Sequence, residues 1–194
     1  MKNFMLVAGL GNPEGKYFNT YHNVGFQCAE KLAELLGADF KKKGNQLLAA
    51  CHSSPADLFI LKPLTYMNLS GQAVAAVSRK YKIPPEKIIV FVDDIYIDKG
   101  NIRVSFGGSA GGHNGLRSIN EILGTSQYTK IRIGVKPENP PHSMSDYVLS
   151  KIKPDDGLAI QKAVDAAQML LQGENLAKVQ GVFNTTNTTA GDSK

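Results

Sequence analysis

The densest chemical signal in the sequence is a glycine-rich stretch that ends in a histidine and an asparagine. Residues 107–115 read GGSAGGHNG, which places five glycines in nine positions. Glycine tolerates positive φ and lets a bulky partner approach the backbone closely. Residues 116–123 predict a short helix that stops at Gly124, and a helix N-terminus behind such a loop favours an anion. The stretch predicts a site for a large, negatively charged partner, with a flexible surface loop as the simpler alternative.

Other polar residues of the chain suit the chemistry of a water and a carbonyl group. Asn12, His22, Asp93, His113 and Asn114 each come soon after an apolar run. Amide and neutral imidazole groups are polar without being strongly charged, so they can orient a water molecule and a carbonyl oxygen. This set of residues indicates acid–base chemistry if the fold brings its members together.

The apolar runs that precede these residues define the elements that must position them. Runs typical of buried strands alternate with patterns typical of amphipathic helices. We expect strands at 4–9, 47–51, 58–61, 88–92, 102–106 and 131–135, and helices at 24–36, 71–81 (with Ser70 as its N-cap), 116–123 and 157–171. This alternation predicts a single α/β domain over residues 1–183, with a twisted, mixed but largely parallel sheet and helices on both faces. Residues 184–194 read as a disordered tail.

The predicted architecture also says where the polar residues should meet. In open α/β sheets, ligands bind in the crevice beyond the carboxyl ends of the strands. Four loops of the chain, after the runs at 4–9, 58–61, 88–92 and 102–106, carry the polar residues. We therefore expect these four loops to converge on one rim.

Composition bounds the class of protein and its partners. The chain has 194 residues and a net charge of +5, which is mild but favours an anionic partner. Its two cysteines, Cys28 and Cys51, have no CxxC spacing, so neither a disulfide framework nor a zinc site is indicated. No signal peptide or membrane span is evident in the sequence, and we expect a cytoplasmic protein.

Two motifs in the sequence point to other enzyme classes. The stretch at 9–11 resembles the start of a dinucleotide fingerprint, but Pro13 interrupts it and Glu14 stands at the third glycine position. Residues 107–111 satisfy G-x-S-x-G around Ser109, as in serine hydrolases. That class needs an acid and then a histidine downstream, and the sequence offers no convincing pair in that order. The glycine stretch also lacks the Lys-Ser/Thr ending of a P-loop.

A metal site is a further alternative for the same polar residues. His22, Asp93 and His113 are of the types that bind metals, but no paired histidine spacing such as HExxH supports a metal site. We expect no metal and no cofactor.

Several motifs together identify a family resemblance. The stretches are GLGNP at 9–13, YHNVG at 21–25, KPLTYMNLSG at 62–71, DD at 93–94, GSAGGHNGL at 108–116 and IRIG at 131–134, and they span most of the first 150 residues. In their combination, order and spacing the chain resembles the bacterial peptidyl-tRNA hydrolases. Members of that family free tRNA from peptidyl-tRNA by hydrolysing the ester bond.

The resemblance assigns catalytic roles residue by residue. His22 matches the histidine that draws a proton from the attacking water, and Asp93 matches the carboxylate that orients this histidine. Asn12 matches the asparagine that discriminates blocked from free aminoacyl-tRNA. The resemblance also implies a monomer that uses no covalent intermediate.

The resemblance further implies a set of substrate contacts. The matching residues are Tyr17, Tyr66, Met67, Asn68, His113 and Asn114. Relatives commonly place basic residues at both alternate positions of the strand at 102–106, where they meet a tRNA phosphate. Only Arg103 is basic here, because residue 105 is serine. In our interpretation phosphate binding is weaker than in relatives or leans on Lys99 or Arg132.

Two functions from other classes stay open at this point. One is a catalytically silent RNA-binding protein on the same fold, since fold does not fix function. The other is a small-molecule esterase that uses Ser109, which serine-directed reagents would inactivate.

Overall fold

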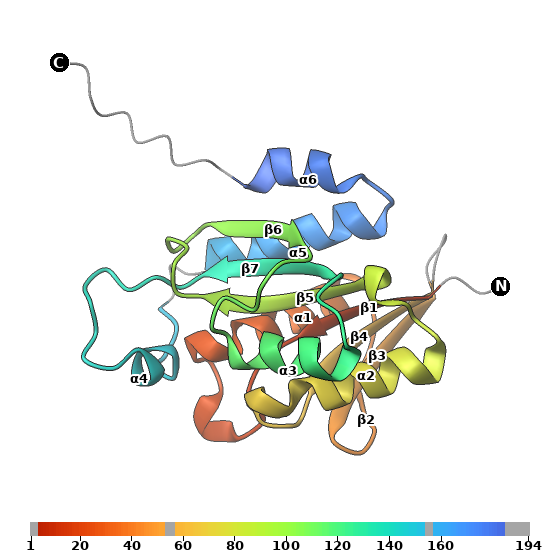
Figure 1. The fold of residues 1–194 in the computed structure, drawn as a ribbon, viewed down its shortest axis with the longest axis horizontal. Helices are drawn as coiled ribbons and strands as arrows, with labels where there is room; N and C mark the ends of the chain where they lie inside the picture. The colour runs from red at the N-terminus through yellow and green to blue at the C-terminus, as the bar shows by residue number, and fades with distance from the viewer. Residues whose placement is uncertain (1–3, 53–56, 154–156, 185–194) are drawn as a thin grey trace.

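A seven-stranded sheet forms the centre of the molecule (Figure 1). The computed structural model describes residues 4–52, 57–153 and 157–184. The strands are β1 (Phe4–Gly9), β2 (Lys41–Lys42), β3 (Gln46–His52), β4 (Asp57–Pro63), β5 (Ile88–Asp94), β6 (Ile102–Phe106) and β7 (Thr129–Gly134). Their order across the sheet is β2-β3-β4-β1-β5-β7-β6. The sheet is mixed and largely parallel, as the sequence predicts.

The parallel part of the sheet consists of four neighbouring strands. β1 pairs in parallel with β4 and β5, and β5 pairs in parallel with β7. The outer pairs β2–β3, β3–β4 and β6–β7 are antiparallel. β6 therefore runs against its neighbour, so its carboxyl end lies at the opposite end of the sheet from those of β1, β4, β5 and β7 (Figure 1).

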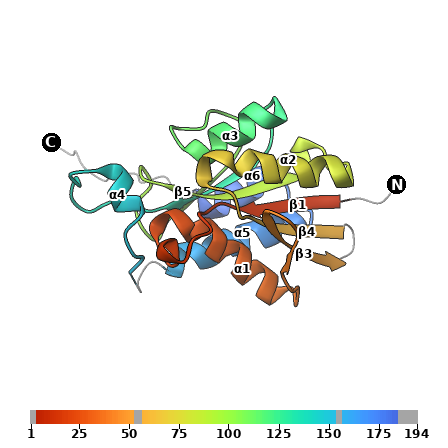
Figure 2. The same cartoon turned by 90° about the horizontal axis from the view of Figure 1, so that it is seen from below.

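Helices cover both faces of the sheet (Figure 2). They are α1 (Val24–Leu35), α2 (Ser70–Tyr81), α3 (Asn114–Leu123), α4 (Met144–Val148), α5 (Gly157–Leu171) and α6 (Leu176–Phe183), with short 3-10 turns η1 (Gly15–Tyr17), η2 (Tyr21–Asn23), η3 (Met67–Leu69) and η4 (Pro85–Lys87). α1, α5 and α6 contribute to one core, and α2 and α3 contribute to the other. Successive residues of the buried strands alternate between the two cores, because strand side chains point to opposite faces in turn. Val7 faces the α1 side, and Leu6 and Ala8 face the α2 side.

Some local expectations differ from the structure. The sequence patterns do not predict α4 and α6, and both helices are short. Ser70 is the first residue of α2 rather than its N-cap, because the capping position belongs to Leu69. The Ser70 hydroxyl instead donates a hydrogen bond to the Met67 carbonyl at 2.9 Å. Serine side chains often bond to a nearby backbone group in this way.

The C-terminal end of the described chain covers the edge of the sheet. The Asn184 side chain accepts a hydrogen bond from the backbone N–H of Val104 at 2.7 Å and donates to the Val104 carbonyl at 2.8 Å. The amide thus replaces the ladder partner that an edge strand lacks. Asn184 is the first residue of the expected tail, and residues 185–194 lie outside the described residues.

Close contact between α1 and the sheet sets the position of the segment that precedes α1. A Cβ atom on Gly25 would lie 2.6 Å from the backbone of both Leu10 and Phe91. Glycine is needed here because any side chain would push α1 away from the ends of β1 and β5. The turn η2, which carries His22, leads directly into α1.

This contact predicts that Gly25→Ala destabilises the protein. We expect the free energy of unfolding to fall by about 1–3 kcal/mol, because the new methyl group meets backbone atoms that cannot rotate away. Gly181→Ala is the matched control, since an added Cβ in α6 meets no atom within 4 Å. For Gly181→Ala we expect the free energy of unfolding to rise by about 0.5–1 kcal/mol, because alanine favours a helix more than glycine does. Denaturant unfolding of both variants checks the pair, and equal stabilities would contradict it.

Candidate functional site

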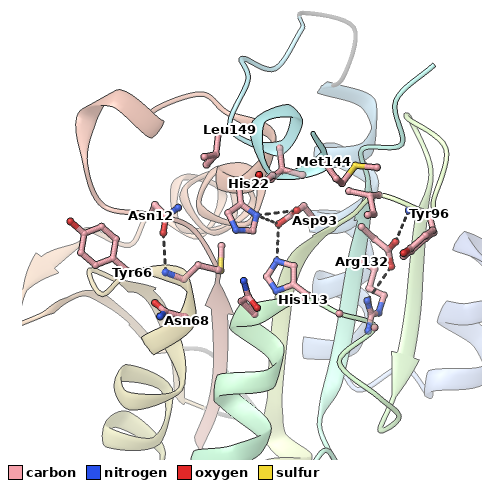
Figure 3. A pocket seen from close by; sticks show the side chains of 18 residues that line it. Asn12, His22, Tyr66, Asn68, Asp93, Tyr96, His113, Arg132, Met144 and Leu149 are labelled. Atoms are coloured by element: carbon pink, nitrogen blue, oxygen red, sulfur yellow. Dashed lines mark hydrogen bonds and ion pairs between the residues drawn. The ribbon is translucent and has the colours of Figure 1, made fainter. Parts of the chain in front are cut away.

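A cavity of about 460 Å³ opens at the carboxyl ends of the parallel strands (Figure 3). Asn12 reaches it from the loop after β1, and Asp93 lies near the end of β5. Its walls come from η2, η3, the glycine-rich stretch and α4. The lining residues are Asn12, His22, Tyr66, Met67, Asn68, Asp93, Asp94, Ile95, Tyr96, Gly111, Gly112, His113, Asn114, Arg132, Met144, Ser145, Val148 and Leu149. The fold thus brings together most of the residues that the sequence singles out.

Three of the four expected loops follow the parallel strands β1, β4 and β5, so strand direction alone brings them to the same end of the sheet. The glycine loop (residues 107–113) follows β6, whose carboxyl end lies at the other end of the sheet. The loop reaches the cavity because it runs back along β7. Its carbonyl oxygens accept hydrogen bonds from Lys130 at the start and from Arg132 farther on. The expected rim is present, but the expected reason for the fourth loop was wrong.

A buried carboxylate lies between two imidazole rings in this cavity. Asp93 is 4% exposed. Its Oδ1 lies 3.0 Å from Nδ1 of His22 and 3.0 Å from Nε2 of His113, and its Oδ2 lies 3.1 Å from His22 Nδ1. The three side chains come from η2, β5 and the end of the glycine loop, so sequence distance gives no hint of the contact.

The hydrogen-bond partners fix which nitrogen of each ring carries a proton. Nδ1 of His113 accepts the backbone N–H groups of Gly115 at 3.1 Å and Leu116 at 3.4 Å, which caps α3. Its Nε2 therefore carries the proton that faces Asp93. Nδ1 of His22 also faces the carboxylate and must carry a proton, so its Nε2 is the basic nitrogen that faces the cavity.

The same contacts set the charge states of the carboxylate and of His22. Burial by itself raises the pKa of Asp93, but the nearby His22 and His113 outweigh it and hold that pKa well below its ordinary value. Burial by itself lowers the pKa of His22, but the Asp93 carboxylate outweighs it and raises that pKa above its ordinary value of 6.5. Asp93 is thus a fixed negative charge, and His22 is a stronger base than a free imidazole.

The three side chains are a hydrogen-bonded array rather than a vacant ligand set. One ligand atom from each of His22, Asp93 and His113 lies within 4.8 Å of the others. The nitrogens that face the carboxylate, however, both carry protons in the bonding pattern above, and a metal ion needs a free lone pair. Among the described residues, this array favours acid–base chemistry over metal binding.

Asn12 presents a hydrogen-bond donor to the cavity. Its Oδ1 accepts the backbone N–H of Met67 at 2.9 Å, which identifies the oxygen because a backbone N–H can only donate. The Asn23 side chain holds the backbone of Asn12 by two hydrogen bonds. Its Oδ1 accepts the Asn12 N–H at 2.8 Å, and its Nδ2 donates to the Asn12 carbonyl oxygen at 2.9 Å. The Nδ2 group is therefore the part of the Asn12 side chain left for a ligand (Figure 3).

Comparison with known proteins connects this geometry to a family. The model of the family "Peptidyl-tRNA hydrolase" matches residues 6–191. A peptidyl-tRNA hydrolase from Pelodictyon phaeoclathratiforme is 43% identical over 159 residues, which cover 81% of this chain and 84% of that protein. One from Bifidobacterium adolescentis is 41% identical over 194 residues, covering 93% and 97%. The chain belongs to the peptidyl-tRNA hydrolase family.

A solved structure agrees with this assignment. The peptidyl-tRNA hydrolase from Acinetobacter baumannii superposes with a TM-score of 0.84 and 34% identity, covering 93% of this chain and 94% of that one. Within the described residues, no helix has both the length and the apolar character needed to span a membrane.

The substrate contacts expected from the sequence fall into two groups. Met67, Asn68, His113 and Asn114 line the cavity, as does Tyr66, which is 52% exposed and donates its hydroxyl hydrogen bond to Glu14. Tyr17 is outside the lining. It is half-buried, and the Lys16 ammonium lies 4.8 Å from its ring centroid.

The basic residues differ in how free their charges are. Arg103 is exposed on β6, directly opposite Arg132 on β7. Arg132 lines the cavity, but its guanidinium already pairs with Asp94 at 3.0 Å and with the Ser109 carbonyl at 3.0 Å. Lys99 donates to the Tyr21 hydroxyl at 2.6 Å and lies against the Tyr21 ring. Arg103 is therefore the better candidate for a phosphate contact.

The sequence reasoning missed the apolar side of the cavity. Ile95 and Tyr96 follow β5, and Met144, Val148 and Leu149 come from α4 and its end. A signal for α4 was present, because Ser143 caps it by accepting the N–H of Asp146 three residues on. Serine followed three residues later by an acidic residue is a common helix start.

The electrostatics of this cavity predict how His22 titrates. We expect NMR titration to give a His22 pKa above 6.5 in the wild type, because the Asp93 carboxylate stabilises the imidazolium. Asp93→Asn should lower that pKa to below 6.5, since the effect of burial then acts alone. Asp165→Asn on α5, outside the cavity, is the control that should leave the titration unchanged. An unchanged His22 pKa in Asp93→Asn would contradict the pairing.

Proposed function

We propose that this enzyme of the peptidyl-tRNA hydrolase family cleaves the ester between a peptide and the 3′-terminal ribose of tRNA with a water activated by His22. The observation that carries the proposal is the Asp93 carboxylate, which holds His22 by Nδ1 and leaves Nε2 toward the cavity. Family membership makes the protein a hydrolase of peptidyl-tRNA. The residue roles below are our proposal.

The chemical steps need one base and no covalent intermediate. Nε2 of His22 takes a proton from water as the water oxygen attacks the ester carbonyl carbon. Asp93 stabilises the imidazolium that forms. When the tetrahedral intermediate collapses, the bond to the ribose oxygen breaks, and the imidazolium returns the proton to that oxygen. A positioned base of this kind contributes roughly 10²–10⁴-fold to the rate.

An amide on the glycine-loop side serves the developing oxyanion. Oδ1 of Asn114 accepts a hydrogen bond from the Arg117 guanidinium at 2.7 Å, which turns its Nδ2 into the available donor. Asn68 also lines the cavity and is the second candidate for donating a hydrogen bond to the oxyanion. Loss of one such donor costs on the order of 3 kcal/mol of transition-state stabilisation.

Asn12 gives the site its preference for a blocked amino group. The acyl group of a peptide or N-blocked amino acid offers a carbonyl oxygen, which Nδ2 of Asn12 can bind directly. A free aminoacyl-tRNA offers an ammonium group, which has only donors. The ammonium and Nδ2 of Asn12 would then be two donors facing each other, which is unfavourable in a partly buried site. The site therefore rejects the free amine.

The proposed nucleic acid contacts come from two tyrosines and one exposed arginine. Tyr66 and Tyr17 offer ring faces to unpaired bases, and exposed Arg103 offers a charge to a backbone phosphate. We propose further that residues 1–183 act as one domain, that the protein is a monomer, and that it works in the cytoplasm, where translation produces its substrate.

The serine-hydrolase alternative finds no base on His113, which follows Ser109 by four residues. Ser109 lies in the glycine loop, and its carbonyl is bound by Arg132. The nearby His113 uses one nitrogen to cap α3 and the other to bond Asp93. Ser109 therefore has no free imidazole nitrogen on this histidine to activate its hydroxyl.

His22→Ala tests the proposed base. We expect kcat for an N-blocked aminoacyl-tRNA to fall roughly 10²–10⁴-fold, while tRNA affinity stays near that of the wild type. Single-turnover release of the acyl amino acid and a separate binding titration measure the two quantities, both with chelator present. Activity within tenfold of the wild type would remove His22 from this role.

Asn12→Asp tests the proposed discrimination with a side chain of the same shape. One carboxylate oxygen still accepts the Met67 N–H, but the other replaces the donor with a charged acceptor. We expect kcat/KM for the blocked substrate to fall roughly tenfold to a hundredfold, from about 1–3 kcal/mol for an unmade polar contact. The kcat/KM for free aminoacyl-tRNA should rise relative to the kcat/KM for the blocked substrate. An unchanged ratio of the two substrates would show that Asn12 does not read the amino group.

A further inference from the structure

Lys130 is a fully buried cation that the chemistry described above does not use. Its side chain is 0% exposed on β7, on the face that packs toward α2 and α3. Its ammonium donates to the carbonyl oxygens of Gly107 at 2.6 Å, Gly108 at 3.3 Å and Ser126 at 3.3 Å. The Tyr128 ring centroid lies 4.3 Å away. A buried charge is rare unless it is fully partnered, so this arrangement calls for a role.

The number of donors on Lys130 matches the number of acceptors around it. An ammonium group has three N–H bonds, and three carbonyl oxygens face it here. Two of these carbonyls belong to glycines at φ +67° and +82°, a conformation that residues with side chains rarely adopt. The start of the glycine loop is thus folded around the cation.

The direction of β6 explains why the loop needs this anchor. β6 ends at the far end of the sheet from the cavity, so the loop must turn back along β7. Lys130 holds its first two carbonyls, Arg132 holds the carbonyl of Ser109, and His113 at its end bonds Asp93. Three anchors in chain order therefore lead from the far end of β7 to the catalytic carboxylate.

We propose that Lys130 is a positioning residue for the hydrolysis of peptidyl-tRNA: its ammonium turns the glycine loop back along β7 and so holds Gly111, Gly112, His113 and Asn114 as a wall of the cavity. This inference rests on the proposed roles of that wall in substrate binding. It predicts that the loop loosens when the ammonium loses its charge, because a neutral amine has two N–H bonds for three carbonyls.

The charge of Lys130 changes within the range in which the enzyme can be assayed. Burial, followed by the nearby positive charge of Arg132, lowers its pKa to about 8. Burial raises the pKa of Tyr128, so Tyr128 stays neutral. The opposite residue on β6 is Ser105, which does not titrate there. Among these neighbours, Lys130 alone changes charge between pH 7 and 9.

The test is the dependence of kcat and KM on pH from 6.5 to 9.0, with uncatalysed ester hydrolysis subtracted. For the wild type we expect KM to rise on the order of tenfold above pH 8, as the fraction of protein with a competent loop falls. Lys130→Met should have the high KM at every pH. Lys130→Arg keeps a permanent cation and should have a KM that stays flat across pH. Exposed Lys42→Met is the matched control and should follow the wild type.

A purely structural lysine gives a different result. If Lys130→Met lowers the melting temperature but leaves KM and its pH dependence as in the wild type, the proposal is overturned. It is also overturned if the wild-type KM is flat from pH 7 to 9.0.

A readout on the free protein covers a variant that does not fold and separates this proposal from the proposed function. NMR signals of the Gly111 and Gly112 amides in the wild type should shift with a midpoint near pH 8. The absence of this shift would overturn the proposed role of Lys130 as an anchor. If the shift occurs but blocked aminoacyl-tRNA is not cleaved, the anchor stands and the proposed function fails.

Discussion

Asp93 carries a negative charge at a position that is almost closed to solvent, and such a charge is tolerated only where partners surround it. Its two imidazole partners arrive from opposite faces of the sheet. His22 precedes α1, which packs in one core, and His113 caps α3, which packs in the other. The carboxylate at the end of β5 therefore joins the two helical layers at the point where the cavity opens. Removing it would leave His22 without the group that fixes its orientation and would leave His113 held only by its cap on α3.

The polar groups of the cavity share a common form of preorganisation. In each case, one polar atom of the side chain accepts a hydrogen bond from a group that can only donate. The other polar atom of the same side chain must therefore be a donor. A backbone N–H fixes the oxygen of Asn12, two backbone N–H groups fix one nitrogen of His113, and a guanidinium fixes the oxygen of Asn114. Donors that are already oriented need no rearrangement as charge develops on the substrate, which is why such sites are effective.

Close packing makes these short contacts possible. Gly25 allows α1 to meet the backbone at the ends of β1 and β5, and this sets the height of His22 above the sheet. On the other face, the glycine loop runs along β7 and is held by Lys130 and Arg132. The cavity walls are thus fixed from both layers, and a small shift of either layer would separate groups that must lie within hydrogen-bonding distance.

The sequence by itself determined the class of fold and the chemical character of the site. Apolar runs such as 4–9 and 88–92 became β1 and β5, because a strand buried on both faces needs a continuous apolar sequence. The motifs around His22, Asp93 and His113 identified the family. These signals are local, so they can be recognised without knowing what each segment contacts.

Only the tertiary structure decided the direction of β6, the proton positions on the histidines and the role of Lys130. A strand has the same local preferences whether its neighbour is parallel or antiparallel, so the sequence of 102–106 could not show that the glycine loop must turn back. The tautomer of His113 depends on Asp93, twenty residues away, and on the start of α3. Lys130 looks like an ordinary polar residue of a strand, and two carbonyls of the distant glycine loop, with that of nearby Ser126, make it a buried anchor. Each of these properties arises from contacts between segments, which residue type and spacing alone do not encode.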